Sequence, residues 1–327
     1  MKKTNWGIMG PGNIAHKFAE SLRNMETAEL TAVGSRDADR AKKFAEKYGA
    51  KRYYGNYKEF LMDPDIEIVY IATTHTSHFE CAMMCLEAGK GVLCEKPFTI
   101  NAGQARKLVN TARGKNIFMM EAMWTRYLPA IAKIRELLAS GVLGDIRMIK
   151  ADFGYRGDMK SEGRTLNLAL GGGALLDVGI YPLSFTTMIL GTEPEKVTGL
   201  ACLNPTGADE QCTFSLYYGG GELAVLSAAV GTNIPTDAYI LGTKGFIRIP
   251  EFWHASSFEL NINGERQLFN LPYISTGYAH EALAAMECLA GGKLESPVMP
   301  LDETIRLMEI MDDIRLQLGV KYREDMV

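Results

Sequence analysis

Apolar positions in the first 121 residues form short runs that alternate with stretches of helical spacing. The predicted strands are NWGIMG, ELTAVGS, KRYYG, IEIVYIAT, GVLCEKP and NIFMMEA. The predicted helices are GNIAHKFAESLRNM, DADRAKKFAEKYG, NYKEFLMD, SHFECAMMCLEAG and NAGQARKLVNTARG. Continuously apolar strands that alternate with helices are typical of a parallel sheet covered on both faces. The pattern therefore predicts an α/β protein whose residues 1–121 form a Rossmann-type dinucleotide-binding domain.

The apolar pattern changes from residue 122 onwards. One helix, LPAIAKIRELLASG, is followed by alternating strands: DIRMIKADFGYR, VTGLACLN, CTFSLYY, ELAVLSAAV, DAYILGT, GFIRIP, SFELNIN and ERQLFN. Two further helices, YAHEALAAMECLAGG and LDETIRLMEIMDDIRLQLG, come near the end. Because tight turns join neighbouring strands, an antiparallel arrangement is favoured. We expect residues 122–327 to form an α+β domain with an open, mainly antiparallel sheet that binds the substrate and forms a dimer.

Composition and charge narrow the class of protein. The chain has 327 residues, of which 47% are hydrophobic and 23% charged, as is ordinary for a soluble globular protein. The net charge is −4 without a block of like charges, so neither a nucleic acid nor an anionic membrane is expected as a partner. The sequence suggests no signal peptide and no window that could span a bilayer, which predicts a cytoplasmic protein. The six cysteines form no CxxC pair, so we predict neither a metal site nor a disulfide framework.

The first strand–helix junction carries a glycine motif, GPGNIA at residues 10–15, of the form GxGxxA. The tight turn needs Gly10, and a pyrophosphate needs the bare backbone of Gly12. The helix that starts there presents the N–H groups of Asn13 and Ile14, and the positive end of its dipole, to the phosphates. Because the motif lies between a predicted strand and a predicted helix, it indicates dinucleotide binding rather than a plain turn.

The end of the second predicted strand bears on which dinucleotide is bound. An NAD-selective site usually has an acidic residue there for the ribose 2′-hydroxyl, whereas this chain has Ser35 and Arg36, followed by Asp37. Arg36 can pair with a 2′-phosphate and Ser35 can donate to it. Asp37 is expected to cap the next helix. In the alternative interpretation Arg36 is a solvated surface residue. The pattern favours NADP, with NAD as the second possibility.

Polar residues follow the apolar strands at the carboxyl edge of the predicted sheet, where open α/β sheets bind ligands. Thr73 and His75 follow the fourth strand and are expected along the cofactor, while His78 is either a capping residue or a functional one. Glu95 and Lys96 follow the fifth strand in LCEKPF. Charged residues before a proline end many strands, so this segment alone does not establish a site. Its place at the carboxyl edge makes Lys96 the best candidate, with Glu95 beside the cofactor in a positioning role.

A second polar cluster lies in GGGALLDVGIYPL, residues 171–183. If a helix follows the glycines, Asp177 and Tyr181 are four residues apart and project from one face. Pro182 is expected to kink or break that helix, because proline lacks the N–H group that the helix requires. A buried, satisfied aspartate and a packed tyrosine would fit the same pattern.

The glycine turn, EKP after a strand, and GGGxLxDxGxY in the following domain together resemble the glucose–fructose oxidoreductase/inositol dehydrogenase (Gfo/Idh/MocA) family. The order and spacing agree over essentially the whole chain. The segments EAMWTRYLP and DVGIY are most similar to the branch of dimeric dihydrodiol dehydrogenases and NADP-dependent xylose dehydrogenases. Inositol dehydrogenase-like members usually carry histidine where this chain has Tyr181, so the resemblance is to the tyrosine-bearing branch.

The resemblance implies hydride transfer between NADP(H) and a hydroxyl or carbonyl carbon of a sugar or cyclic diol. It implies that Lys96 lies near the nicotinamide and the reacting oxygen, and that Tyr181 is the general acid/base with Asp177 in the same constellation. It also implies a homodimer through the C-terminal sheet and a cis Lys96–Pro97 bond. The expected substrate contacts are Trp124, Arg126, Phe153 and Trp253.

The chemistry of the lysine and tyrosine supports these roles. Their side chains ordinarily have pKa values of about 10.4 and about 10. An ammonium beside the phenol lowers the pKa of the phenol and stabilises a developing alkoxide. The alternative is a dinucleotide-binding regulator or sensor without turnover, against which the presence of Lys96, Asp177 and Tyr181 argues. Aromatic side chains bind sugars and apolar rings equally well, so the substrate stays open between the two.

Overall fold

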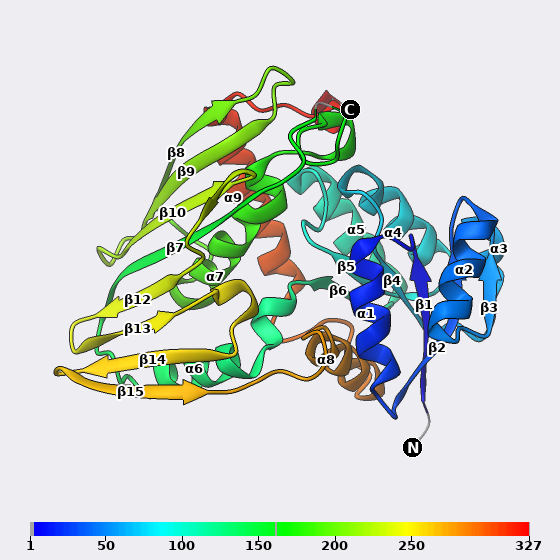
Figure 1. Ribbon diagram of the computed structural model, residues 1–327, viewed down its shortest axis with the longest axis horizontal. Coiled ribbons are helices and arrows are strands. Elements are labelled where there is room, and N and C mark those ends of the chain that lie inside the picture. The colour runs from blue at the N-terminus through cyan, green and yellow to red at the C-terminus, as the bar shows by residue number, and fades with distance from the viewer. Residues whose placement is uncertain (1–2, 161, 327) are drawn as a thin grey trace. The chain divides into compact units, whose positions relative to one another are not determined.

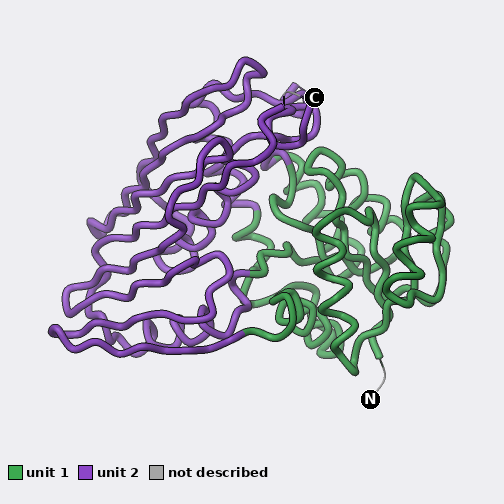
Figure 2. The backbone as a smooth tube through the Cα atoms, viewed as in Figure 1, with its two compact units in different colours: residues 1–99, 103–124, 273–304 green, residues 100–102, 125–272, 305–327 purple. Residues whose placement is uncertain are grey.

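The structure is a computed structural model that describes residues 3–160 and 162–326 (Figure 1). Within this part of the chain the backbone divides into two compact units, coloured separately in Figure 2. The first unit comprises residues 1–99, 103–124 and 273–304, and the second 100–102, 125–272 and 305–327. The boundary predicted after residue 121 lies close to the crossing after residue 124. The sequence did not predict that residues 273–304 return to the first unit.

A parallel sheet with the strand order β3-β2-β1-β4-β5-β6 forms the centre of the first unit. Its strands are β1 (Thr4–Met9), β2 (Ala28–Gly34), β3 (Arg52–Tyr54), β4 (Ile68–Ile71), β5 (Gly91–Glu95) and β6 (Met119–Ala122). The chain builds outward from β1 to β3 and then starts again beside β1 with β4. The order therefore reverses between β1 and β4, and the carboxyl ends beside such a reversal are where open α/β sheets bind ligands.

Helices cover this sheet, as the sequence predicts. They are α1 (Asn13–Arg23), α2 (Ala38–Tyr48), α3 (Tyr57–Met62), α4 (His78–Glu87) and α5 (Ala102–Lys115), with the short 3₁₀ turn η1 (His75–Ser77) before α4. Every residue of β4, β5 and β6 is buried, as in a sheet covered on both faces. On α1, the ring of Phe18 stacks on Tyr70 of β4 with 3.7 Å between the ring centroids. The predicted Rossmann-type fold is confirmed.

The returning segment completes the first unit beyond β6. It contains α8 (Ala279–Ala290), which packs against α1, and the first residues of α9 (Leu301–Leu318). The N–H of Met119 donates to the carbonyl of Leu294 (2.9 Å), so the segment continues the hydrogen bonding at the start of β6. Thr304 donates to Glu121 of β6 (2.9 Å). A unit that looks continuous in the sequence therefore needs a segment from the last sixth of the chain.

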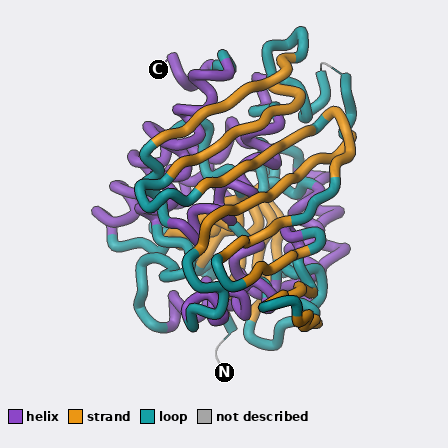
Figure 3. The backbone as a smooth tube through the Cα atoms, turned by 90° about the vertical axis from the view of Figure 1, so that its left-hand side faces the viewer, coloured by secondary structure: helices purple, strands orange, loops and turns teal. Residues whose placement is uncertain are grey.

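The second unit is built on a large sheet with the order β15-β14-β13-β12-β7-β10-β9-β8, and β11 pairs with β7; Figure 3 looks onto its strands. The strands are β7 (Ile146–Arg156), β8 (Lys196–Leu203), β9 (Asp209–Tyr217), β10 (Leu223–Ala229), β11 (Gly231–Ile234), β12 (Ala238–Gly242), β13 (Gly245–Ile249), β14 (Ser257–Ile262) and β15 (Glu265–Asn270). The sheet is mainly antiparallel, as predicted. However, β7 and β10 run parallel, which makes the sheet mixed. The sequence did not predict β11.

Helices pack against one face of this sheet. They are α6 (Pro129–Ala139), α7 (Ile180–Leu190) and the rest of α9, with the short turns η2 (Trp124–Tyr127), η3 (Leu168–Leu170), η4 (Leu175–Gly179), η5 (Phe252–His254) and η6 (Arg323–Met326). Helix α7 contacts β7 and β10, the strands at the middle of the sheet. Ile149 and Ala151 of β7 and Leu226 of β10 point to this face and are buried. The alternating pattern of these strands thus reflects one buried face and one open face.

The stretch Leu168–Leu190 is long and apolar enough to cross a membrane by length and composition, contrary to the sequence-based expectation. However, 83% of its most apolar window is buried inside the protein. Helix α7 is buried from Ile180 to Thr187 because it packs under the large sheet. The apolar character of this stretch is therefore that of a core helix.

Candidate active site

The glycine-rich turn between β1 and α1 has the geometry that the motif predicts. Gly10 has φ +86°, and a Cβ there would lie 2.7 Å from Cγ2 of Thr73. Gly12 precedes α1 in an extended conformation. A Cβ on Gly12 would meet, among the residues that the structure describes, only the carbonyl oxygen of Ala72, at an ordinary 3.6 Å. The fold itself thus requires glycine at position 10, whereas position 12 leaves room for a group from outside.

The N-terminus of α1 fits an anion. In the described part of the chain no side chain caps this helix, and its first turn contains no acidic residue. The N–H groups of Asn13 and Ile14 are among the first of the helix, which have no intrahelical partner. Nε of Arg40 donates to the carbonyl of Pro11 (3.1 Å), which ties the turn to α2. These residues fit the pyrophosphate of a dinucleotide, which such helix ends bind.

At the end of β2, the side chains of Ser35 and Asp37 accept hydrogen bonds from backbone N–H groups of the protein. The N–H of Asp37 donates to Oγ of Ser35 (3.2 Å). The N–H of Arg40 donates to Oδ1 of Asp37 (3.1 Å), which confirms the predicted cap of α2. The side chain of Arg36 is exposed, and it forms no hydrogen bond or ion pair with the described residues. The Arg36 guanidinium thus stays accessible to a phosphate, while Asp37 is engaged in the cap.

The carboxyl end of β4 is tied to the EKP segment through His78. Its Nδ1 lies 2.8 Å from the carbonyl oxygen of Pro97, and its Nε2 lies 3.3 Å from that of Thr73. Burial lowers the pKa of His78 to about 4, so the ring is neutral near pH 7 and can donate to one of these carbonyls. These contacts favour a structural role for His78 over a functional one. His75 is buried in η1, and its ring centroid lies 5.8 Å from that of His78.

Lys96 follows the last residue of β5, and the Lys96–Pro97 bond is cis, as predicted. Glu95 is buried with 5% of its surface exposed. The hydroxyl of Tyr70 donates to one of its carboxyl oxygens, and the N–H of Lys96 donates to the other (3.1 Å). Glu95 therefore holds the main chain of Lys96, which agrees with a positioning role. The side chain of Lys96 is half-buried.

In the second unit, the glycine loop that leads into α7 is anchored by residues far away in the sequence. The N–H of Leu175 donates to Oδ2 of Asp209 (2.6 Å), and the hydroxyl of Tyr322 donates to the carbonyl of Gly172 (2.8 Å). Gly173 has φ +137°, and a Cβ there would collide with Asp209. The polypeptide then forms the π-helical turn η4 and continues as α7.

The break predicted at Pro182 takes the form of this π-helical turn. Pro182 is the third residue of α7, directly after η4, and the helix continues beyond it without ending. A π turn leaves space for the proline ring where a regular turn would clash. Tyr181 lies at the junction, buried with 6% of its surface exposed.

Three of the predicted site residues converge in the second unit. The ring centroid of Tyr181 lies 5.2 Å from that of Phe153 on β7 and 6.3 Å from that of Trp253 in η5. The rings of Phe153 and Trp253 stack with 4.9 Å between centroids. The hydroxyl of Thr125 donates to the carbonyl of Trp253 (2.7 Å) and holds η5 in place. The result is an aromatic cluster, Phe153, Tyr181 and Trp253, around the candidate acid/base.

Asp177 takes part in a network that sequence reasoning did not find. Arg164 binds both of its carboxyl oxygens (3.1 and 3.0 Å), and the hydroxyl of Tyr155 donates to Oδ2 (2.7 Å). Burial is the main cause that raises the pKa of Tyr155, and the negative charge of Asp177 raises it further. The phenol of Tyr155 therefore remains a donor. No regular spacing connects Arg164 and Tyr155 with Asp177 in the sequence, so no local pattern could have indicated the network.

Two predicted substrate contacts are packed inside the protein. Arg126 is buried, and it donates to Oγ and the carbonyl oxygen of Ser184 (2.9 and 2.7 Å) and to Thr187 (3.1 Å). It therefore supports α7. Trp124 is buried and stacks on Tyr278 with 4.5 Å between ring centroids. These contacts favour a structural function for both residues over the predicted contact with substrate.

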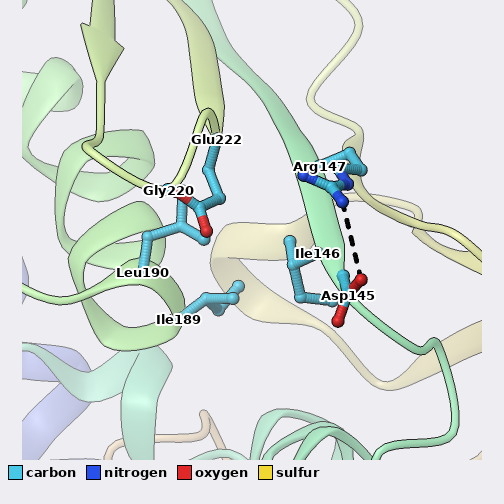
Figure 4. Close-up of a pocket in the computed structure, with 7 residues that line it drawn as sticks. All are labelled: Asp145, Ile146, Arg147, Ile189, Leu190, Gly220 and Glu222. Atoms are coloured by element: carbon cyan, nitrogen blue, oxygen red, sulfur yellow. Dashed lines mark hydrogen bonds and ion pairs between the residues drawn. The ribbon is translucent and has the colours of Figure 1, made fainter.

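A surface pocket of about 520 Å³ lies elsewhere in the second unit (Figure 4). It is lined by Asp145, Ile146, Arg147, Ile189, Leu190, Gly220 and Glu222. These residues come from the start of β7, the end of α7 and the turn between β9 and β10. None of the predicted site residues lines it, so it gives no support to a role in the proposed chemistry.

The first unit has a Rossmann sheet, with a glycine turn that fits an anion and a lysine at the carboxyl edge, and the second unit is built on an open sheet. These features are typical of nicotinamide-dependent oxidoreductases. The chain belongs to the Gfo/Idh/MocA family of oxidoreductases. Residues 4–122 match the family model described as "Oxidoreductase family, NAD-binding Rossmann fold". Residues 131–248 match the model of the GFO/IDH/MocA C-terminal domain.

Relatives with full-length similarity agree with this assignment. The chain is 39% identical over 331 residues to trans-1,2-dihydrobenzene-1,2-diol dehydrogenase of Mus musculus, covering 98% of each chain. It is 38% identical to the human protein of that name, again with 98% coverage of both. KijD10, a 3-ketoreductase from Actinomadura kijaniata solved with NADP and TDP-benzene, is 25% identical with a TM-score of 0.87 over 97% of this chain and 98% of that one. The aldose-aldose oxidoreductase from Caulobacter crescentus (23% identical, TM-score 0.89, covering 97% of this chain and 98% of that one) shares the fold.

Proposed function

We propose that this protein is an NADP-linked dehydrogenase or reductase that transfers hydride between the nicotinamide and a secondary alcohol or carbonyl carbon of a cyclic diol or sugar. The observation that carries the proposal is the aromatic cluster, in which Tyr181 lies beside the stacked rings of Phe153 and Trp253. Full-length similarity to dihydrodiol dehydrogenases supports it. Aromatic faces suit a flat ring or the apolar face of a sugar, and the phenol lies beside them.

Each residue of the site has a distinct role in the proposed reaction. Tyr181 takes the proton of the hydroxyl that is oxidised, or returns it to the carbonyl that is reduced. The Lys96 ammonium stabilises negative charge on the reacting oxygen. Asp177, fixed by Arg164 and Tyr155, orients the helical turn that carries Tyr181. The nicotinamide, when bound, supplies the hydride acceptor or donor.

The preference for NADP rests on the end of β2. Arg36 is exposed and suits a 2′-phosphate, while the carboxylate of Asp37 is engaged in the cap of α2. The structure of KijD10 contains NADP, which is in keeping with this preference. Replacing Arg36 with alanine should weaken NADPH binding at least about tenfold and leave NADH binding unchanged, because one charged contact contributes on the order of 1.5–3 kcal/mol. Fluorescence titration with both cofactors measures the two affinities.

The decisive experiment is a turnover assay with purified protein. Absorbance of NADPH is followed with aldoses, anhydro-sugars, dicarbonyls and cyclic trans-diols, each with NADP and NAD. Turnover of a cyclic diol or a sugar supports the proposal and identifies the substrate class. Tight NADPH binding without turnover across the whole panel would instead favour the regulator or sensor.

We also propose a homodimer formed through the open face of the large sheet. Leu200, Val225 and Leu268 on this face are 78%, 44% and 60% exposed. A depression of about 400 Å³ along β8, β9 and β10 adds further apolar surface around Leu200. Exposed apolar area of this kind on one sheet face is typical of a subunit interface.

Light scattering after size exclusion tests the dimer. Wild type should elute as a dimer, and Leu200→Glu/Val225→Glu as a monomer, because two buried charges at an interface cost several kcal/mol. Met62→Glu on α3, where Met62 is 79% exposed, is the matched control and should leave the dimer intact. A wild-type protein that is monomeric at micromolar concentration would contradict the proposal.

A further inference from the structure

The glycine loop before the π-helical turn η4 is buried and closely fitted. All residues of 171–174 are buried. A Cβ on Gly172 would lie 2.6 Å from the backbone N of Asn167, so this position has no room for a side chain. The turn η4 then begins at Leu175, whose N–H donates to the carboxylate of Asp209 (2.6 Å). The start of the turn therefore depends on a side chain from the first residue of β9.

Asp209 is a costly residue to bury. Its surface is 1% exposed, and Oδ1 has no hydrogen-bond partner among the residues that the structure describes. Burial raises the pKa of Asp209 to about 6, although the hydrogen bond from Leu175 acts in the opposite direction, so the carboxylate is ionised near pH 7. A buried charge with an unsatisfied oxygen destabilises a protein. A Cβ on Gly173 would collide with Oδ1, so the carboxylate and the loop fit each other closely.

The second contact with this loop comes from the C-terminal segment. Tyr322 is buried, and its hydroxyl donates to the carbonyl of Gly172 (2.8 Å). Burial raises the pKa of this phenol well above its usual range, so it remains a donor. The guanidinium of Arg315 lies over the ring of Tyr322, 5.1 Å from the centroid. The N–H of Tyr322 donates to Asp325 (2.9 Å), which also pairs with Arg315 (2.8 Å). The tyrosine is thus itself held on several sides.

Both contacts act on the segment that leads to the candidate acid/base. The N–H of Asp177 donates to the carbonyl of Gly173 (3.1 Å), so η4 continues the loop without a break. Asp177 lies in the middle of η4, and Tyr181 follows this turn as the second residue of α7. A displacement of the loop would therefore move both residues.

We propose that Asp209 and Tyr322 are positioning residues for Tyr181. By fixing the glycine loop they determine where η4 begins, and through this turn they keep the phenol of Tyr181 in place beside Phe153 and Trp253. The cost of burying the Asp209 carboxylate is then offset by a precisely placed catalytic group, as in other sites where function and stability compete. The inference rests on the acid/base role proposed for Tyr181.

Hydrogen–deuterium exchange measured by mass spectrometry tests the contacts without any substrate. In Asp209→Ala and in Tyr322→Phe, peptides from residues 171–181 should exchange at least about tenfold faster than in wild type, while peptides from β12–β14 should not change. Tyr218→Phe is the matched control, because the hydroxyl of Tyr218 donates to the carbonyl of Gly191 at the other end of α7 (3.0 Å). This variant should exchange as wild type does in residues 171–181. Wild-type exchange there in Asp209→Ala would overturn the proposal.

Kinetics test the effect on the reaction. Asp209→Ala should lower kcat about 10- to 100-fold, as small misplacements of a catalytic group do, with NADPH affinity within about twofold. Asp209→Asn keeps an acceptor for the N–H of Leu175 and should retain kcat within about threefold of wild type. Glu210→Gln, which removes the charge of the next residue on β9, is the control and should behave as wild type. A fully active Asp209→Ala enzyme, or an Asp209→Asn enzyme as impaired as Asp209→Ala, would overturn the positioning role.

A double variant tests whether the two residues act on the same loop. Tyr322→Phe keeps the ring under Arg315 and should lower kcat about 3- to 10-fold. In Asp209→Ala the loop is already released, so adding Tyr322→Phe should lower kcat by less than it does in wild type. Independent, multiplicative losses would contradict a shared action. If no substrate turns over in wild type, the proposed function fails, while hydrogen exchange still decides whether these residues fix the turn.

Discussion

At the scale of single residues, the EKP segment is held at its main chain by two buried side chains. The carboxylate of Glu95 accepts the N–H of Lys96, and Nδ1 of His78 bonds the carbonyl of Pro97. Both holding residues are buried, whereas the side chain of Lys96 is half-buried. A change confined to the Lys96 side chain should therefore affect chemistry much more than folding.

Lys96→Met should abolish turnover, because it removes the ammonium that stabilises charge on the reacting oxygen. NADPH affinity should stay within about tenfold, or about 1.4 kcal/mol, because the glycine turn and Arg36 lie elsewhere. Steady-state kinetics and fluorescence titration measure both quantities. Lys107→Met, at an exposed position of α5, is the control and should behave as wild type. A fully active Lys96→Met enzyme would refute the assignment of Lys96.

His78 gives a prediction about acid stability. Its pKa falls from 6.5 to about 4 on folding, so the unfolded chain binds more protons between these values. The stabilisation that neutral His78 provides is fully present above the pKa of this histidine in the unfolded chain. It is lost as the pH falls through the pKa of His78 in the folded protein. The difference corresponds to about 3 kcal/mol of unfolding free energy.

Urea unfolding of wild type and His78→Gln at several pH values tests this. The glutamine can donate to one carbonyl but does not titrate in this range, so its stability should depend less on pH between about 6.5 and about 4. His254→Gln, in η5 of the second unit, controls for the loss of a histidine elsewhere. Parallel curves for wild type and His78→Gln would show that His78 does not carry the effect.

Sequence reasoning could identify residues through a local motif but not through distant partners. The glycine turn, Lys96 and Tyr181 stand in recognisable segments, and the sequence also named Phe153 and Trp253, which do lie beside Tyr181. By contrast, Arg164 and Tyr155 had no local signal, because both contact Asp177 from distant positions in the sequence. The same limit explains why Arg126 was expected at the substrate: nothing local shows that its guanidinium bonds α7.

At the scale of elements, the β1–α1 turn separates what the fold requires from what a ligand requires. Gly10→Ala forces an alanine to φ +86° and against Thr73, so it should destabilise the protein by about 1–3 kcal/mol. Gly12→Ala meets no close contact in the described structure and should change stability by less than about 0.5 kcal/mol. However, its methyl group should fill the space for the pyrophosphate and weaken NADPH binding at least about tenfold.

The two variants are controls for one another. Thermal unfolding and fluorescence titration are measured on both, with and without NADPH. If Gly12→Ala bound NADPH as tightly as wild type, the cofactor would not approach the turn at this residue. If Gly10→Ala were as stable as wild type, the turn would tolerate an alanine despite its backbone.

Hydrophobic periodicity predicted most elements, because each strand or helix has one apolar period along its own residues. The elements it missed depend on other parts of the chain. Strand β11 is a short segment defined by pairing with β7, and the parallel pairing of β7 with β10 depends on the elements between them. The π-helical turn η4 arises where the proline of α7 follows a loop anchored by Asp209. Pro182 indicated a disturbance, but not its form.

At the scale of the whole molecule, compact units do not follow chain order. Residues 273–304 belong to the first unit, where α8 packs against α1 and Thr304 donates to Glu121. Arg113 of α5 pairs with Glu295 and Asp302 of the same segment (3.1 and 2.7 Å). A change in the apolar pattern along the sequence marks where one kind of sheet ends. It does not show that a later helix packs in the first unit.

The return of this segment predicts how fragments behave. A fragment of residues 1–124 lacks α8, the hydrogen bond from Met119 to Leu294 and the ion pairs of Arg113. It should expose the apolar surface that α8 covers, and it should aggregate or unfold without cooperativity. The apolar area that one packed helix buries contributes free energy of the same order as the about 5–15 kcal/mol that is typical of a whole domain's stability. Joining residues 273–304 to it through a flexible linker should restore a cooperative transition and NADPH binding.

Circular dichroism during heating and fluorescence titration compare the two fragments with the full chain. A matched control joins residues 305–327 to the fragment through the same linker, since that segment belongs to the second unit and should restore nothing. A fragment of residues 1–124 that unfolds cooperatively and binds NADPH as the full chain does would show that the sequence-based boundary near residue 121 describes a self-sufficient domain. Rescue by residues 273–304 alone would show instead that the Rossmann unit is completed by the far end of the chain.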